Sequence, residues 1–203
     1  MRPLSSLPPS YFEARYRENH DPWNFAHSDY ERQKYAATLK ALTRHRYQNA
    51  LEIGCSIGVF TRMLSERCDA VTALDVSETA LHQCREHCKD KPNVMIERGA
   101  VPRDWPDGCY DLIIFSEVLY YLSHEDLVAT AGRTRNALDP GAEILLVHWL
   151  GETDYPLTGN EAADLFIQQL ADISVLQVQD WTSDYRLDLL QKAPAVPRIS
   201  ADS

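Results

Sequence analysis

Short apolar runs alternate with amphipathic stretches along most of this 203-residue chain. The clearest apolar runs end at Ile53, Leu74, Phe115 and Trp149 and indicate buried strands, while the intervening stretches repeat apolar residues every three or four positions, as helices do. Such alternation is typical of a mostly parallel sheet with helices on both faces and right-handed connections. The pattern therefore predicts a doubly wound α/β fold.

Capping and breaking residues give the expected boundaries. Two N-terminal helices are expected to begin at the capping-box patterns Ser10-x-x-Glu13 and Ser28-x-x-Glu31, before the first strand. Later helices are expected at 59–67, 78–89, 124–138 and 160–171, with Ser77, Ser123 and Asn160 as caps. Further strands are expected at 70–75, 94–97, 110–115, 143–149, 174–179 and 186–190, and the last two form a hairpin. The strand at 110–115 is apolar throughout and is expected at the centre of the sheet.

The same pattern suggests a division of the chain into three parts. Residues 1–43 are expected to form a loose proline-rich arm and two lid helices, residues 44–192 a Rossmann-like domain, and residues 193–203 a disordered tail.

One turn carries the strongest functional signal. The segment 49–63, NALEIGCSIGVFTRM, predicts a strand that passes through a glycine turn into a helix. Gly54 allows a tight bend and close approach of a ligand to the backbone, and Gly58 lets the helix pack near the strand. Asp75 ends the next strand, roughly 20 residues further on, where a carboxylate can accept hydrogen bonds from a ribose diol. A cofactor is expected at this turn.

Two residues of this region argue against a dinucleotide. Ser56 stands in place of the second glycine of the dinucleotide pattern, which gives the pyrophosphate its room. Glu52, directly before the turn, would repel phosphate and suits a ligand with hydroxyl groups and positive charge. Glu52-x-Gly54-x-x-x-Gly58 followed by Asp75 resembles the first two signatures of class I methyltransferases. The resemblance implies S-adenosylmethionine as cofactor and a seven-stranded, mostly parallel sheet with an antiparallel C-terminal strand.

Charge and hydropathy narrow the class of partners. The chain has 30 acidic and 20 basic residues, a formal charge of −10, and no basic stripe suited to a phosphate backbone. Nucleic acid is therefore not expected as a substrate, and a neutral or cationic small molecule is. No apolar run approaches the length of about 18 residues that indicates a membrane span, and the N-terminus lacks the apolar core of a signal peptide. We expect a soluble, cytoplasmic protein that makes no membrane contact and is a monomer or weak homodimer.

The five cysteines are odd in number and lack the spacing of a disulfide framework, which indicates reduced thiols. Cys84-x-x-x-Cys88, with His82 and His87 nearby, is the candidate metal site. The two cysteines share a helix face with Ala80 and Leu81 at core spacing, and free cysteine packs as a small hydrophobe. No metal is assigned.

Methyl transfer from a sulfonium depends on positioning and exclusion of water. Aromatic faces attract a cationic sulfur, and the available rings are those of Trp23, Tyr120, Tyr121 and Trp149. The alternative for Trp23 is an anchor that packs the N-terminal helices onto the domain.

An amine acceptor must be deprotonated when it attacks, so we expect a proton acceptor at the strand ends. Glu117 and His148 are the candidates. The alternatives are a loop or helix-capping carboxylate for Glu117 and a hydrogen-bonded, half-buried histidine for His148. Asp154 and Tyr155, on the next loop, are weaker candidates for holding acceptor hydroxyls.

Two further groups are assigned to the cofactor. Arg32 and Lys34, on the second N-terminal helix, are candidates to meet its methionine carboxylate, with ordinary solvated charges as the alternative. Ala100 and Val101 lie in the loop where this architecture holds an adenine edge.

The resemblance extends to the nodulation protein S family over roughly residues 20–140. It is carried by Asp21-Pro22-Trp23, Glu31, Ala50-Leu51-Glu52-x-Gly54-Cys55, Phe60-Thr61 and 117–122, EVLYYL. These methyltransferases N-methylate the exposed glucosamine of a partly deacetylated chitooligosaccharide, so the resemblance implies an amino-sugar or oligosaccharide acceptor. It also implies cofactor-site roles for Trp23, Glu52, Gly54, Gly58 and Asp75, and places Glu117 with the two tyrosines near the transferred methyl group.

The expected site is thus defined by two sets of residues. The catalytic set is Glu117, His148 and Tyr120, and the cofactor-binding set is Trp23, Arg32, Lys34, Glu52, Gly54, Cys55, Gly58, Asp75, Val76, Ala100, Val101, Ser116, Glu117 and Tyr121. Ala100 replaces an expected acidic residue, so the adenine contact is assigned to the Val101 backbone. The sequence after Gly141 departs from the family pattern, in the region expected to touch the acceptor.

Two other functions remain open on the sequence. One is a methyltransferase for another small acceptor, by O- or carboxyl-methylation in secondary metabolism, and the other is a cofactor-binding module without catalysis. A nicotinamide oxidoreductase fits poorly because of Ser56 and Glu52.

Overall fold

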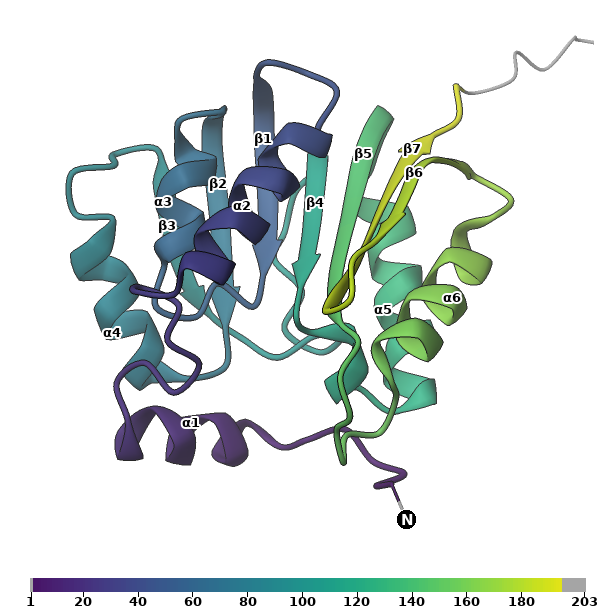
Figure 1. The fold of residues 1–203 in the computed structure, drawn as a ribbon. Helices are drawn as coiled ribbons and strands as arrows, with labels where there is room; N and C mark the ends of the chain where they lie inside the picture. Colours follow the sequence, from purple (N-terminus) through teal and green to yellow (C-terminus); the bar gives the residue numbers. More distant parts are fainter. Residues whose placement is uncertain (1, 195–203) are drawn as a thin grey trace, which may run out of the picture.

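Seven strands form one sheet in the order β3-β2-β1-β4-β5-β7-β6 (Figure 1) in a computed structural model that describes residues 2–194. The strands are β1 Tyr47–Ile53, β2 Cys68–Asp75, β3 Val94–Arg98, β4 Tyr110–Ser116, β5 Leu138–Trp149, β6 Ser174–Trp181 and β7 Tyr185–Lys192. Strands β1 to β5 pair in parallel, and β7 runs antiparallel between β5 and β6. The predicted doubly wound sheet with an antiparallel C-terminal strand is confirmed.

Six α-helices and one short 3-10 helix accompany the sheet in the described part of the chain. They are α1 Pro9–Glu18, α2 Asp29–Ala41, α3 Val59–Ser65, α4 Glu78–His87, η1 Leu119–Tyr121, α5 His124–Ala137 and α6 Gly159–Leu170. Helices α2 and α3 cover one face of the sheet, and α5 and α6 cover the other (Figure 1). Helix α1 differs because it lies across the carboxyl end of the sheet (Figure 1).

Strand β4 lies at the centre of the sheet and alternates between its two faces. Leu112 and Ile114 pack with α2 and α3, while Ile113 and Phe115 pack with α5 and α6. All four side chains are fully buried. This confirms the prediction of a central strand and explains why 110–115 is apolar throughout.

Several predicted caps are confirmed and two are wrong. Ser28, Ser77 and Ser123 each accept a hydrogen bond from the backbone N–H three residues later. Helix α1, however, has Pro8 at its N-cap and no side-chain cap, because the Glu13 of the predicted capping box is engaged by α4 instead. Helix α6 is capped by a reciprocal capping box between Thr158 and Glu161 rather than by Asn160.

The prediction of a loose N-terminal arm is wrong for the described residues. The Leu7 N–H donates to the Tyr121 carbonyl at 2.9 Å, and the Ser123 N–H donates to Ser6 Oγ at 2.8 Å. The arm therefore lies against the loop that follows β4. Most of the tail expected at 193–203 lies outside the described residues.

Strand β5 begins at Leu138, five residues before the expected start at Glu143. It includes Asp139-Pro140-Gly141, which stops the preceding helix and produces a register shift against β4. Cys84 and Cys88 are buried with Leu81 in the core beneath α4, as the helical spacing predicts. Within residues 2–194, no helix is both long enough and apolar enough to cross a bilayer.

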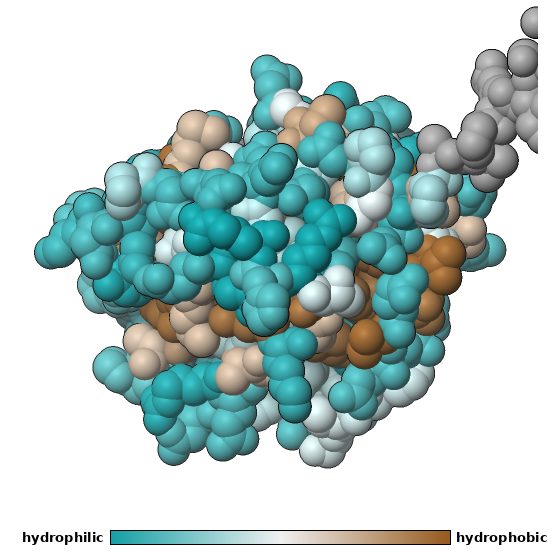
Figure 2. Space-filling model, turned by 90° about the horizontal axis from the view of Figure 1, so that it is seen from above, coloured by the Kyte–Doolittle hydropathy of each residue, from teal (hydrophilic) through white to brown (hydrophobic). Residues whose placement is uncertain are grey.

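The end of the sheet opposite α1 has a mostly hydrophilic surface (Figure 2). The carboxyl ends of the parallel strands, where α1 lies, carry the hollow described next.

Candidate active site

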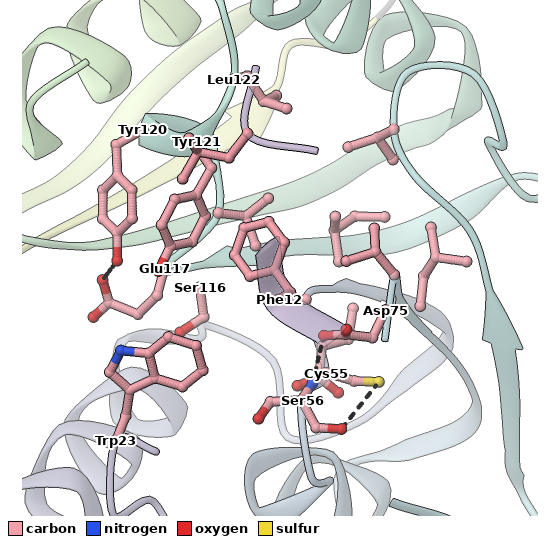
Figure 3. A pocket seen from close by; sticks show the side chains of 18 of the residues that line it. Phe12, Trp23, Cys55, Ser56, Asp75, Ser116, Glu117, Tyr120, Tyr121 and Leu122 are labelled. Carbon is pink, nitrogen blue, oxygen red and sulfur yellow. Dashed lines mark hydrogen bonds between the residues drawn. The ribbon is translucent and has the colours of Figure 1, made fainter. Parts of the chain in front are cut away.

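A cavity of about 780 Å³ lies at the carboxyl ends of β1, β2 and β4, beneath α1 and beside α2. Strand order reverses between β1 and β4, and ligands of doubly wound sheets bind at such a switch point. Thirteen of the predicted site residues line it: Trp23, Lys34, Glu52, Gly54, Cys55, Asp75, Val76, Ala100, Val101, Ser116, Glu117, Tyr120 and Tyr121. Figure 3 shows seven of these, Trp23, Cys55, Asp75, Ser116, Glu117, Tyr120 and Tyr121, converging from separate elements.

The glycine turn is formed as predicted, although its second glycine, Gly58, packs against helix α4 and not against the strand. Gly54 has φ +85°, and a side chain there would collide with Val118. Gly58, with φ +84°, is the N-cap of α3, and a Cβ would lie 2.6 Å from the Cys84 sulfur. Gly58 therefore allows close packing on α4 rather than on the strand, and it does not line the cavity.

Asp75 holds the glycine turn and the start of α4 together. Its Oδ2 accepts the Ser56 N–H at 2.9 Å (Figure 3), and its Oδ1 accepts the Ser77 N–H at the same distance. Burial raises the pKa of this carboxyl and these backbone hydrogen bonds partly offset the effect. Since a carboxylate oxygen can accept two hydrogen bonds, both oxygens keep capacity for a ligand.

Glu52 lies one residue before the end of β1. It is 2 % exposed, and its Oε2 accepts no hydrogen bond from residues 2–194. Burial raises the pKa of this carboxyl to about 8. A buried acceptor without a partner is unusual in a native protein, and a ligand bearing N–H or O–H donors would satisfy it.

Glu117 sits at the end of β4 in a left-handed backbone conformation, φ 58°. Its Oε1 accepts from Lys34 Nζ at 2.7 Å, and its Oε2 accepts from the Tyr120 hydroxyl at 2.6 Å and the Trp149 N–H at 2.8 Å. Burial is the largest single influence and would raise the pKa of Glu117, but the Lys34 charge and the hydrogen bonds from Lys34 and Tyr120 together outweigh it, and the pKa is lowered. A strained backbone held by this many contacts is typical of a functional position.

His148 does not face the cavity, so this part of the prediction is wrong. It lies on the same side of β5 as Leu146, towards α5 and α6, because side chains alternate along a strand. Its Nε2 accepts the Leu119 N–H at 3.3 Å, and burial lowers its pKa to about 4. The alternative reading of a hydrogen-bonded histidine holds, except that the side chain is fully buried.

Arg32 is also misplaced by the prediction. Its side chain is 58 % exposed, pairs with Asp29 on the surface and does not line the cavity. Lys34 is buried between Glu31 and Glu117 instead. A lysine ammonium has three donors, so Lys34 retains one for a ligand.

The four predicted aromatic rings all line the cavity: Trp23, Tyr120, Tyr121 and Trp149. Tyr120 stacks on Tyr155 with ring centroids 5.5 Å apart, and Trp23 stacks on Phe25. Tyr155 thus joins the wall, while the neighbouring Asp154 does not.

The largest omission from the predicted site is α1, which contributes Phe12 and Tyr16. Phe12 packs edge-on against Tyr121 at 4.8 Å and projects into the cavity (Figure 3). The hydroxyls of Tyr16 and Ser56 share a hydrogen bond of 2.5 Å. An amphipathic helix with aromatic residues is a weak signal for a site, because the same residues would serve as ordinary packing contacts.

Glu13 fixes α1 in this position. It accepts hydrogen bonds from the Ser77 hydroxyl at 2.8 Å and the Thr79 hydroxyl at 2.7 Å, at the N-terminus of α4. One carboxylate thereby joins the helix above the cavity to the helix that follows Asp75.

At the far end of the cavity, Ala100 and Val101 form part of the wall as predicted. The Ala100 N–H donates to the Asp104 carboxylate at 3.0 Å and is therefore occupied. An adenine contact through the Val101 backbone stays a prediction.

Residues 13–142 of this chain are similar in sequence to a known protein family. The model for Nodulation protein S (NodS) matches residues 13–142. Nodulation protein S of Rhizobium tropici is 30% identical over 127 residues, which cover 62% of this chain and 53% of that protein. Nodulation protein S of Bradyrhizobium diazoefficiens is 34% identical over 117 residues, which cover 57% and 55%. The chain spans about half the length of these curated relatives.

Solved structures with the same fold extend the match beyond residue 142. A Pseudomonas syringae protein provisionally assigned as a methyltransferase is 33% identical, with a TM-score of 0.72 over 80% of this chain and 99% of that one. The N-methyltransferase NodS from Bradyrhizobium japonicum WM9, in complex with S-adenosyl-L-homocysteine, has a TM-score of 0.77 at 22% identity, over 91% of this chain and 98% of that one.

Proposed function

This chain belongs to the nodulation protein S family and has the class I methyltransferase fold, and we propose that it uses S-adenosylmethionine to methylate the amino nitrogen of an amino sugar or a partly deacetylated chitooligosaccharide. The observation that carries the choice of an amine is the charge of one cavity wall. Lys34 lies between two carboxylates, Glu31 and Glu117, so this buried group carries a net negative charge. Such a wall favours a cationic or N–H-bearing acceptor over a carboxylate.

The remaining cavity residues suit S-adenosylmethionine. Asp75 keeps acceptor capacity for a ribose diol, and Glu52 has a buried oxygen that a donor on the cofactor would satisfy. A cavity of about 780 Å³ is within the range of pockets that enclose small ligands. When bound, the cofactor supplies a methyl group activated by a positively charged sulfur.

The chain's own residues contribute mainly by orienting the two reactants and by excluding water from them. The Tyr120 hydroxyl donates a hydrogen bond to Glu117 and the ring stacks on Tyr155, so the ring has a fixed orientation at the cavity wall. Helix α1 covers the carboxyl end of the sheet (Figure 1), a position in which it would shield bound reactants from water. Two well-held reactants can gain roughly 7–11 kcal/mol from positioning, which is the largest contribution available to this chemistry.

A methyl-transfer assay tests the acceptor. The protein is incubated with labelled S-adenosylmethionine and glucosamine-terminated chitooligosaccharides, simple amino sugars or alkylamines. Fully N-acetylated oligosaccharides of the same length are the matched controls, because they lack only the free amine. We expect label on the free amines and none on the controls. Labelling of acceptors without amines, and of no amine, would refute the proposal.

A different small acceptor is the second candidate, because part of the cavity lies outside the family match. Trp149, Glu152, Thr153 and Tyr155 line the cavity, whereas the match ends at residue 142. O- or carboxyl-methylation would appear in the same assay if hydroxyl and carboxylate acceptors are included. Binding of S-adenosyl-L-homocysteine without turnover on any acceptor would instead support a non-catalytic module.

A further inference from the structure

We propose that Glu31 accepts the proton of the acceptor amine, while Glu117 stays ionised and provides a permanent negative charge at the site. The inference rests on the proposed N-methylation and assigns the proton to a residue for which the sequence indicates no catalytic role. Glu31 and Glu117 come from different elements, α2 and the end of β4, and Lys34 bridges them.

Glu31 has a carboxylate oxygen that accepts no hydrogen bond from residues 2–194 and that only the Lys34 ammonium approaches as an ion pair. Its side chain lines the cavity, and the residue is 7 % exposed. Lys34 Nζ lies 3.1 Å from each oxygen of the carboxylate. It donates a hydrogen bond to Oε1, while Oε2 has the ion-pair contact with Lys34 but accepts no hydrogen bond from the described residues. The neighbouring Tyr30 hydroxyl is likewise buried at the cavity without a partner among residues 2–194. A ligand that both donates and accepts hydrogen bonds would satisfy these two groups, the Glu31 carboxylate and the Tyr30 hydroxyl.

Glu117 is the weaker proton acceptor because its contacts are already made. Three donors occupy its two oxygens, namely the Lys34 ammonium, the Tyr120 hydroxyl and the Trp149 N–H. Hydrogen bonds to the charged form of a carboxylate favour that form and make it a poor base. Glu31 receives such a bond from Lys34, and Tyr35 adds a smaller effect in the same direction, so its charged form is stabilised less than that of Glu117.

The charged and titratable groups around Glu31 act in opposite directions. Burial raises its pKa, the Lys34 charge lowers it, and the Glu117 charge raises it, with a net increase. Tyr35, on the same helix, has a raised pKa of its own and stays neutral. Glu52, at the end of β1, is near enough to Tyr35 to raise that pKa. Two carboxylates whose pKa values are driven apart in this way divide the roles of base and permanent charge.

The acceptor amine gives up its proton before it attacks. The acceptor enters as R–NH3⁺, one N–H bond breaks, and the proton passes to the Glu31 carboxylate, which becomes a neutral carboxyl group. The electron pair left on nitrogen is then free to attack the activated methyl group. The carboxyl group returns its proton to water after the methylated amine leaves.

The test compares the pH dependence of kcat in wild type and Glu31→Gln. We expect kcat to fall about 100-fold or more at pH 7. The loss should shrink roughly tenfold for each pH unit until the amine is deprotonated in solution, because free amine then needs no proton acceptor. Affinity for S-adenosyl-L-homocysteine, measured by calorimetry, should stay within about threefold of wild type. A loss of the same size at every pH, or no loss, overturns the proposal.

Two further variants complete the experiment. Asp29→Asn removes an exposed carboxylate from the same helix and is expected to leave kcat unchanged at all pH values. Glu31→Asp keeps the charge beside Lys34 and shortens the side chain by one methylene, so it tests the proposal even where Glu31→Gln fails to fold. It should lower kcat at least tenfold without changing product affinity, and an unchanged kcat overturns the assignment. If the wild type methylates no amine, the proposed function fails instead.

Discussion

Lys34 Nζ lies 2.7 Å from Glu117 Oε1, although the two residues are 83 positions apart in the sequence. This contact joins α2 to the end of the central strand β4. Both side chains are largely buried, with 3% of Lys34 and 15% of Glu117 exposed. Removing one partner of a buried ion pair leaves an uncompensated charge, which is more costly than losing an exposed pair.

Glu117→Gln should therefore lower turnover more than cofactor binding. The amide keeps the shape of the side chain but removes the charge, and it leaves Lys34 with Glu31 alone. We expect kcat to fall about 100-fold, the affinity for S-adenosyl-L-homocysteine to change less than tenfold, and the free energy of unfolding to decrease by about 1–3 kcal/mol. Steady-state kinetics, calorimetry and denaturant unfolding measure the three quantities. Glu125→Gln, an exposed site on α5, is the control. Wild-type turnover in Glu117→Gln would remove Glu117 from the mechanism.

Asp75→Ala should weaken cofactor binding by about 1–3 kcal/mol, because charge-assisted hydrogen bonds to the ribose are lost. Asp75→Ala also leaves the N–H groups of Ser56 and Ser77 without their acceptor, which can distort the turn. Asp75→Asn removes the charge but keeps a side-chain oxygen, so it separates the two effects. Asp69→Ala, an exposed site on the same strand, is the control. Calorimetry with S-adenosyl-L-homocysteine measures the effect, and equal affinities for wild type and Asp75→Ala would exclude Asp75 from the cofactor site.

The glycine turn and its carboxylate could be predicted because their signals are local. Gly54 needs a positive φ and Asp75 ends an apolar strand, and both facts depend on residues a few positions away. The sheet could be predicted for the same reason, since the spacing of apolar residues within each segment distinguishes strands from helices. The Lys34–Glu117 pair could not, because it depends on how α2 docks against β4.

The errors at His148, Arg32 and Glu13 have the same origin. The position of His148 at a strand end suggested a side chain that faces the crevice, but alternation places it on the α5 and α6 side of β5. Arg32 and Lys34 are two positions apart on one helix, so they point in different directions and only Lys34 reaches the cavity. Glu13 matches a capping box in sequence, yet its carboxylate reaches the next layer of structure at Ser77 and Thr79.

Glu13→Gln should loosen α1 over the cavity. Burial raises the pKa of Glu13, but hydrogen bonds from Thr79 and Ser77 outweigh it and hold the pKa at about 2. Because the folded-state pKa is depressed, the contribution of Glu13 to stability is present above pH 4.5 and is lost as the pH falls towards 2. We expect Glu13→Gln to weaken product binding about three- to tenfold at pH 7. Faster hydrogen exchange confined to α1 would support this explanation.

Exchange rates in α1 that match those of the wild type would contradict it. Glu18→Gln is the matched control, because Glu18 lies on the same helix and its side chain is exposed.

Ionisation of Glu52 should make the free energy of unfolding depend strongly on pH. Burial raises the pKa of its carboxyl to about 8 in the folded protein, against an ordinary value of 4.5. A raised folded-state pKa means that the stability contributed by the neutral carboxyl is complete below pH 4.5 and is lost as the pH rises through 8. Between pH 5 and 9 the ligand-free wild type should therefore lose about 4 kcal/mol more stability than Glu52→Gln, whose amide does not ionise.

Denaturant unfolding at several pH values measures this difference, and Glu125→Gln should follow the wild-type curve. A ligand that brings an ammonium group to Glu52 would favour the ionised form, so binding of S-adenosyl-L-homocysteine at pH 7 should release a proton. Calorimetry in two buffers with different ionisation enthalpies detects that proton, and Glu52→Gln should abolish its release. Parallel pH curves for wild type and Glu52→Gln would mean that Glu52 is already ionised in the free protein. In that case the empty acceptor at Oε2 would have to be satisfied by water rather than by the cofactor.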